Sequence, residues 1–160
     1  MLFEEHIERI KKKFSVTDFR VPFVDAREVL GKIERKFVGG RVIETNSTIF
    51  WRSPNWIESL EDKTELGRVS VEQIEQFLNV LDRGKNYWIV VARGESPFLE
   101  YYVYDVRLNA MIELISICAG DFFVVEKKYN WLISFSSDKK KGIVIVSKSG
   151  SHETPFDRKN

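Results

Sequence analysis

The residues best suited to nucleophilic catalysis are one cysteine, Cys118, and two histidines, His6 and His152. A reactive thiolate needs an electropositive, partly exposed setting, such as a helix N-terminus or a neighbouring histidine. Cys118 instead follows Ile115-Ser116-Ile117 at the end of an apolar helical pattern, where a cysteine usually packs as a small hydrophobic residue. Neither histidine belongs to a motif that would place it beside Cys118. The sequence therefore predicts a structural cysteine and no catalytic residues.

Metal and cofactor sites have no better support. One cysteine and two isolated histidines cannot supply the ligands of a structural zinc site. No acidic stretch has the spacing of a calcium-binding loop, and no glycine-rich loop leads from a strand into a helix to hold a phosphate. We therefore expect no metal and no cofactor. The enzymatic alternative is a site without a recognisable motif, assembled from scattered polar residues.

The composition indicates one folded domain. Of 160 residues, 43% are hydrophobic and 13% aromatic, which argues against intrinsic disorder. The balance of 25 Lys and Arg against 24 Asp and Glu removes the simplest case for a protein that coats nucleic acid. No apolar run reaches the roughly 18 residues of a membrane span, and the acidic start Met1–His6 is unlike a signal peptide. These features predict a cytoplasmic protein with no membrane segment.

Hydrophobic periodicity predicts helices in the first half of the chain and strands in the second. Apolar residues recur at helical spacing within residues 2–14, 25–37, 70–81 and 108–118. Continuous or alternating apolar runs predict strands at residues 87–92, 99–106, 122–127, 131–136 and 142–147. The least regular stretch is 41–67, where residues 41–43 and 48–51 could form a hairpin and residues 53–56 could begin a short helix.

These elements predict an α+β fold. The strand order is β-β-α-β-β-β with hairpin-length connections, so we expect a largely antiparallel sheet of about five strands, with the N-terminal helices packed on one face. We expect residues 1–148 to form a single domain. Residues 149–160 offer almost nothing to bury and are predicted to be a flexible tail.

Charge is distributed unevenly along the chain. Residues 45–82 hold three basic and seven acidic side chains, whereas both flanking segments are mildly basic. Aromatic anchors supply affinity at protein interfaces and complementary charge supplies association rate. The predicted partner-binding residues combine both types: Trp51, Trp56, Glu58, Glu61, Asp62 and Glu65. They would suit a basic protein partner. The alternative is that both tryptophans are core residues and that the acidic residues line one solvated helical face.

Two lysine clusters, Lys11–Lys13 and Lys139–Lys141, are the local arguments for nucleic-acid binding. The first completes a helix C-terminus and the second decorates a hairpin tip, where lysines also discourage sheet-edge association. Trp131 belongs to the alternating inward set of its strand, so we expect it in the core and not on a base-stacking surface. A nucleic-acid-binding module is therefore the weaker alternative, and it requires both clusters on one face.

The segment from Asp121 to Ile145, above all Phe122 to Ile133 with the letters KKYNWL, resembles small uncharacterised bacterial α+β proteins with such a hairpin. Some of these are similar to immunity proteins of polymorphic-toxin systems. The resemblance covers the C-terminal half, including the strands at Tyr87-Trp88-Ile89 and Tyr102-Val103-Tyr104, and carries over no functional residue. The absence of catalytic and cofactor motifs, the small single domain and the acidic, tryptophan-bearing segment predict a non-enzymatic protein-binding domain with a basic partner. The resemblance implies its specific form, an immunity-type inhibitor that covers the active site of a toxin.

Overall fold

The computed structural model describes residues 2–22, 26–39, 51–53 (backbone only), 55–94, 99–118, 120–138 and 141–157. The predicted hairpin within residues 41–51 lies outside this part of the chain, apart from the backbone of its last residue. None of the helices in the described part has the length and apolar character that a membrane crossing requires.

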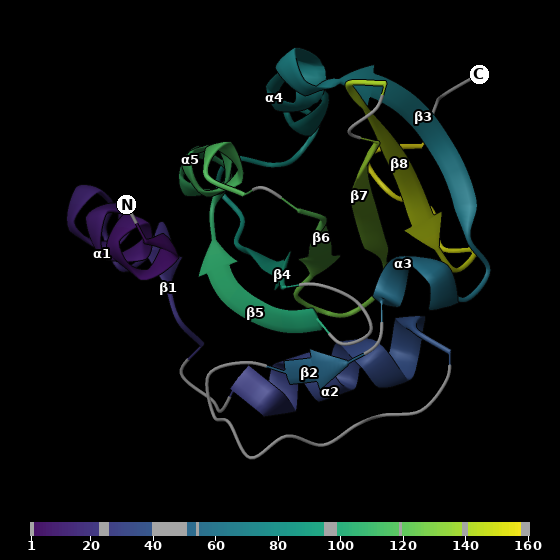
Figure 1. Ribbon diagram of the computed structural model, residues 1–160, viewed down its shortest axis with the longest axis horizontal. Helices are drawn as coiled ribbons and strands as arrows, with labels where there is room; N and C mark the ends of the chain where they lie inside the picture. Colours follow the sequence, from purple (N-terminus) through teal and green to yellow (C-terminus); the bar gives the residue numbers. More distant parts are fainter. Residues whose placement is uncertain are drawn as a thin grey trace.

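The described residues form six helical segments and eight strands (Figure 1). The helical segments are α1 (Phe3–Lys13), α2 (Ala26–Phe37), α3 (Trp56–Ser59), the 3₁₀ helix η1 (Val71–Gln73), α4 (Ile74–Leu78) and α5 (Leu108–Ser116). The strands are β1 (Phe19–Arg20), β2 (Trp51–Ser53), β3 (Thr64–Ser70), β4 (Tyr87–Arg93), β5 (Leu99–Val106), β6 (Phe122–Glu126), β7 (Leu132–Asp138) and β8 (Ile143–Ser149).

All of these strands belong to one antiparallel sheet in the order β1-β5-β4-β6-β7-β8-β3, and β2 pairs with β5 further along the edge that β1 occupies. The α+β class and the antiparallel sheet are thus confirmed. The five predicted strands correspond to β4–β8, which form the middle of the sheet. The count of about five was too low because β1, β2 and β3, all from the first half of the chain, add to its two edges.

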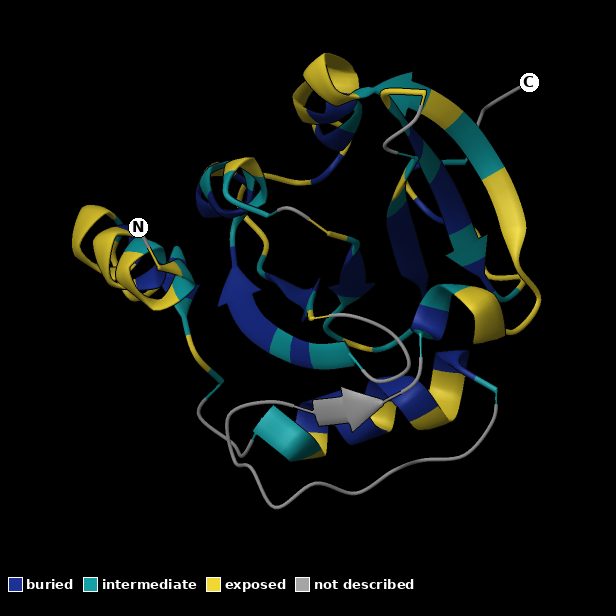
Figure 2. Cartoon of the chain, in the orientation of Figure 1, coloured by how far each residue is buried: buried dark blue, intermediate teal, exposed yellow. Residues whose placement is uncertain are grey.

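Helices cover both faces of the sheet, so the prediction that the N-terminal helices share one face is wrong. One hydrophobic cluster packs α1, α4 and α5 against one face of the sheet, through strand residues such as Ile89 and Phe135. The other joins α2 and α3 to the opposite face, through residues such as Val90 and Phe123. In Figure 1, α2 lies below β5 while α4 and α5 lie above it. The physical reason is that strands such as β4 are apolar and buried on both faces (Figure 2), because each face must be removed from water.

The end of the chain, predicted to be a flexible tail from residue 149, is instead packed against the core as far as residue 157: Ser149 is the last residue of β8, and Thr154 and Phe156 after it are buried. Phe156 is 5% exposed, and its ring stacks on Phe77 of α4 with centroids 5.4 Å apart. Lys148 of β8 donates to the carboxylate of Asp157 at 2.6 Å, and the hydroxyl of Thr154 donates to the same carboxylate at 2.6 Å. The Phe156 ring, the ion pair of Lys148 with Asp157 and the hydrogen bond from Thr154 together hold this polar segment against the core.

Candidate functional site

Of the two tryptophans predicted to bind a partner, Trp56 is a core residue. It is fully buried, and its ring stacks on Tyr101 with centroids 4.2 Å apart and planes at 12°. Its Nε1 donates to the buried Glu34 carboxylate of α2 at 2.7 Å, and its backbone N–H donates to the Tyr101 hydroxyl at 2.9 Å. No partner can reach Trp56, so its predicted role is wrong. Trp51 pairs with Tyr101 through the backbone, and its side chain is outside the described residues.

The four predicted acidic residues are exposed, but they do not share a helical face. Glu58 is in α3, Glu61 and Asp62 are in the following turn, and Glu65 is in β3. The helix ends at Ser59 and the backbone of Asp62 adopts a positive φ of 46°, which turns the chain into the strand. Glu65 is paired with Arg68 at 3.1 Å. These residues form an acidic turn, defined here as Glu58, Glu61, Asp62 and Glu65.

A groove of about 490 Å³ opens elsewhere, between the η1–α4 segment and α5. The η1–α4 wall consists of Val71, Glu72, Ile74, Glu75 and Leu78. The α5 wall consists of Ile112, Ile115 and Ser116, and continues to Cys118 and Gly120. The floor is made by residues of three adjacent strands: Phe122, Phe135, Ser137 and Val144. We call this the α4–α5 groove.

Local sequence rules explain the η1–α4 wall. The backbone N–H of Ser70 donates to the side chain of Gln73 at 3.1 Å, which is one half of the predicted capping box. Ile74 and Leu78 lie one turn apart and are buried against the sheet. This places Glu72 and Glu75 on the outer side, where both are exposed. The single helix predicted for residues 70–81 is shorter and begins as a 3₁₀ turn.

The charged side chains in the described lining of the groove are all acidic. Its described lining contains two carboxylates, from Glu72 and Glu75, and no lysine, arginine or histidine. Within the described residues, neither carboxylate takes part in an ion pair or hydrogen bond. Val71, beside them, keeps 54% of its surface exposed. The groove is therefore an apolar surface with an acidic edge.

Cys118 contributes a thiol to the groove lining, and its setting disfavours the reactive thiolate form. Its Sγ donates to the backbone oxygen of Leu114 at 3.2 Å. Burial raises the pKa of the Cys118 thiol to about 12, against a weak opposing effect of Arg93, so the thiolate is scarce at neutral pH. His6 and His152 do not line the groove. The described part of the chain also contains no group of three or more residues suited to hold a metal ion. Within the described lining, Cys118 is therefore not brought together with a histidine.

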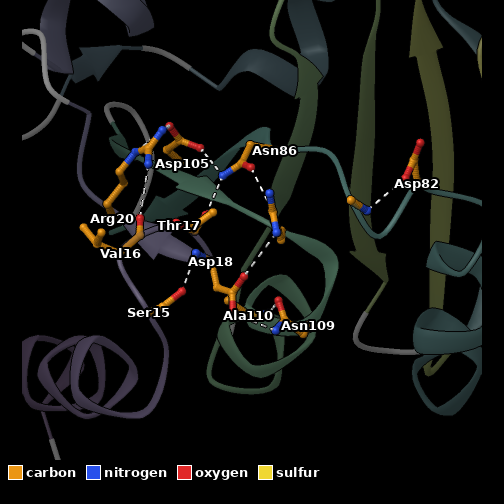
Figure 3. Close-up of polar contacts among 12 residues, drawn as sticks. Ser15, Val16, Thr17, Asp18, Arg20, Asp82, Asn86, Asp105, Asn109 and Ala110 are labelled. Atoms are coloured by element: carbon orange, nitrogen blue, oxygen red, sulfur yellow. Dashed lines mark hydrogen bonds and ion pairs between the residues drawn. The ribbon is translucent and has the colours of Figure 1, made fainter.

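A second polar cluster surrounds Asp105 of β5 (Figure 3). The buried carboxylate accepts from Arg20 Nε at 3.0 Å, from Asn86 Nδ2 at 2.9 Å, and from Lys127 Nζ at 2.6 Å. These donors come from β1, from the residue before β4, and from the residue after β6. Because the charged groups satisfy one another, we assign the cluster a structural role: it fastens β1 and the two inner strands to β5.

The same cluster extends to the start of α5. Asp18 accepts from Asn109 Nδ2 at 3.1 Å and lies 4.0 Å from the Arg107 guanidinium. A carboxylate at this place is favourable, because the first turn of a helix carries partial positive charge. Arg107 also donates to the side-chain oxygen of Asn86 at 3.1 Å. The position of α5, and with it one wall of the α4–α5 groove, is thus tied to the edge of the sheet.

The lysine clusters are only partly described. Lys13, in the last turn of α1, is paired with Glu113 of α5 at 2.7 Å. Lys139 and Lys140 lie outside the described residues, so the common face that a nucleic-acid-binding module requires stays a prediction. Trp131 is 3% exposed, which confirms its predicted place in the core. Lys127 forms an ion pair with Asp105, and its Nζ lies 3.6 Å from the centre of the Trp88 ring.

The sequence predicted the acidic segment but not the groove. Glu72 and Glu75 belong to the acidic stretch 45–82, and their three-residue spacing beside an exposed valine was a usable signal. The α5 wall gave no such signal, because nothing in the local sequence predicts that Ile112 and Ile115 lie opposite α4 on the same face of the sheet.

The fold and the groove together define an α+β protein with an antiparallel sheet, helices on both faces, and an apolar groove with an acidic edge. The chain belongs to a family of unknown function, DUF6756, whose sequence model matches residues 2–152. Searches of the curated proteins and of the solved structures each found no match.

Proposed function

We propose that this chain is a non-enzymatic protein-binding domain for a basic partner and, more specifically, an immunity-type inhibitor of a basic bacterial toxin. The proposal rests on the α4–α5 groove, whose lining, among the residues that the structure describes, combines apolar side chains with Glu72 and Glu75 and contains no basic residue. Apolar surface supplies affinity, while carboxylates favour a cationic partner and speed its approach.

The acidic turn extends this proposal. Glu58, Glu61 and Asp62 are exposed and form no ion pair with another described residue. Charges of this kind act over about a Debye length, so they steer a basic partner without entering its interface. The toxin-inhibitor role is further supported by the resemblance of the C-terminal half to proteins similar to immunity proteins. The high pKa of Cys118 weighs against the enzymatic alternative.

The test is to express the product of the gene adjacent to the one that encodes this chain, and to measure their association. We expect a stable complex that abolishes the toxicity of the neighbouring product. The variant Glu72→Lys/Glu75→Lys should weaken the complex at least about tenfold. Reversing all four residues of the acidic turn should slow association and flatten its salt dependence, with little change in dissociation rate. An adjacent metabolic enzyme that does not bind, or binding indifferent to both sets of substitutions, would contradict the proposal.

A further inference from the structure

The backbone of the α4–α5 groove offers no hydrogen-bonding edge to an occupant. The floor residues Phe122, Phe135 and Val144 belong to β6, β7 and β8. Each of these strands is paired on both sides, because the sheet runs β4-β6-β7-β8-β3. Most of each wall is helical, with interior backbone groups bonded within the helix. Beyond the end of α5, the backbone N–H of Cys118 donates to the backbone oxygen of Ile115 at 3.0 Å, and Gly120 is the other non-helical residue of this wall. The edge strand β3 contributes no residue to the lining.

An extended segment in this groove would therefore leave its own backbone N–H and C=O groups without partners in the protein. Buried backbone groups that lack a partner destabilise a complex, and strand addition requires a free sheet edge. A helix satisfies its backbone internally and presents only side chains to its surroundings. The geometry thus favours a helical occupant over an extended one.

The two walls also differ in charge. The η1–α4 wall carries Glu72 and Glu75, three residues apart on the outer side of one short helical segment. The α5 wall presents Ile112 and Ile115, again three residues apart, and its described lining residues include no charged side chain. A helix that fits both walls has one apolar face toward α5 and the floor, and basic residues along the edge that faces α4.

We propose that the α4–α5 groove binds a basic amphipathic helix of the partner protein. This rests on the proposed function for the source of the helix, but the preference of the groove for a helix is a separate property. It can be measured without the toxin.

The probe is a fluorescein-labelled peptide of about 14 residues, made of leucine and lysine at amphipathic helical spacing, a length near the limit for helix formation in water. Its matched control has the same sequence with two central residues as D-enantiomers, which disrupt a right-handed helix at constant charge and composition. Fluorescence anisotropy measures binding to the full chain. Methyl NMR locates the bound peptide on the wild-type protein without any substitution.

We expect the all-L peptide to bind at least about tenfold more tightly than its D-containing control. Chemical-shift changes should fall on Val71, Ile74, Ile112 and Ile115. Glu72→Lys/Glu75→Lys should weaken binding at least about tenfold, whereas the matched reversal Glu58→Lys/Glu61→Lys should change it less than about twofold at 150 mM salt. Equal binding of the two peptides, or methyl shift changes confined to Ile57 and Leu60 beside the acidic turn, would overturn the proposal.

The outcomes separate the two proposals. If the all-L peptide occupies the groove but the neighbouring gene product does not bind, the toxin-inhibitor role fails and the preference for a helix stands. If the neighbouring product binds but the two peptides bind equally, the preference for a helix fails alone.

Discussion

The ammonium group of Lys127 lies 2.6 Å from the carboxylate of Asp105, although β4 separates their strands in the sheet. The lysine side chain spans this distance by passing over the ring of Trp88, which is paired with Asp105 in the register of β4 and β5. Arg20 holds the same carboxylate from the other side, at 2.9 Å. One buried anion thus connects the edge strand β1 with the inner strands of the sheet.

Replacing Asp105 with Asn should lower the free energy of unfolding by about 2–3 kcal/mol, because two cations then lose their buried partner while staying partly exposed. Denaturation in guanidinium chloride measures this change. The matched control is Glu113→Gln, which removes the exposed ion pair with Lys13 and should cost less than about 1 kcal/mol. Equal losses in the two variants would contradict the structural role of Asp105.

Trp56→Ala should destabilise the fold by about 3–5 kcal/mol, because a fully buried aromatic ring leaves a cavity. The same substitution would leave stability nearly unchanged if Trp56 were a surface anchor. Thermal and chemical denaturation distinguish the two cases. Val80→Ala, at a position that is 51% exposed, is the control and should stay within about 0.5 kcal/mol of the wild type.

The pair of Lys148 and Asp157 should make stability depend on pH. Partial burial alone would raise the pKa of the Asp157 carboxyl, but hydrogen bonds from Lys148 and Thr154 outweigh it and hold the pKa below its ordinary value. A carboxyl whose pKa is lowered by folding stabilises the native state above its unfolded pKa, and this contribution is lost as the pH falls through the folded pKa.

The difference in unfolding free energy between the wild type and Asp157→Asn should therefore be largest at neutral pH. It should shrink below about pH 4, the ordinary range of an aspartate. Glu153→Gln, at an exposed position of the same segment, is the control. A difference between the wild type and Asp157→Asn that stays constant down to pH 2 would show that the carboxylate charge contributes nothing.

Cys118 should resist alkylation in the folded protein. With a pKa of about 12, only about one thiol in ten thousand is ionised at pH 8, and the thiolate is the reactive form. Mass spectrometry after exposure to iodoacetamide should show slow modification of the native chain and rapid modification in denaturant. Rapid modification of the native protein would instead reopen the enzymatic alternative.

The sequence predicted the middle of the sheet because the signals there are local. Residues 87–92 form one uninterrupted apolar run, and the later strands are joined by short turns. The edge strand β3 carries no such signal: Glu65, Gly67 and Arg68 interrupt any alternation, and its stability comes from pairing with β8. The acidic character of the candidate site was likewise visible, but the groove depends on α4 and α5 sharing a face of the sheet, which is a long-range property.

The placement of β1, β2 and β3 has a consequence for how the protein folds. Strands β4 to β8 include hairpins between neighbours in the chain, which can form early. By contrast, Ser70 must pair with Ile143, and Phe19 with Val106. Each of these pairings closes a long loop, and the loss of chain entropy is offset only when most of the chain is ordered. We therefore expect folding on the order of milliseconds to seconds. The segments synthesised first are the ones that must wait longest for their partners.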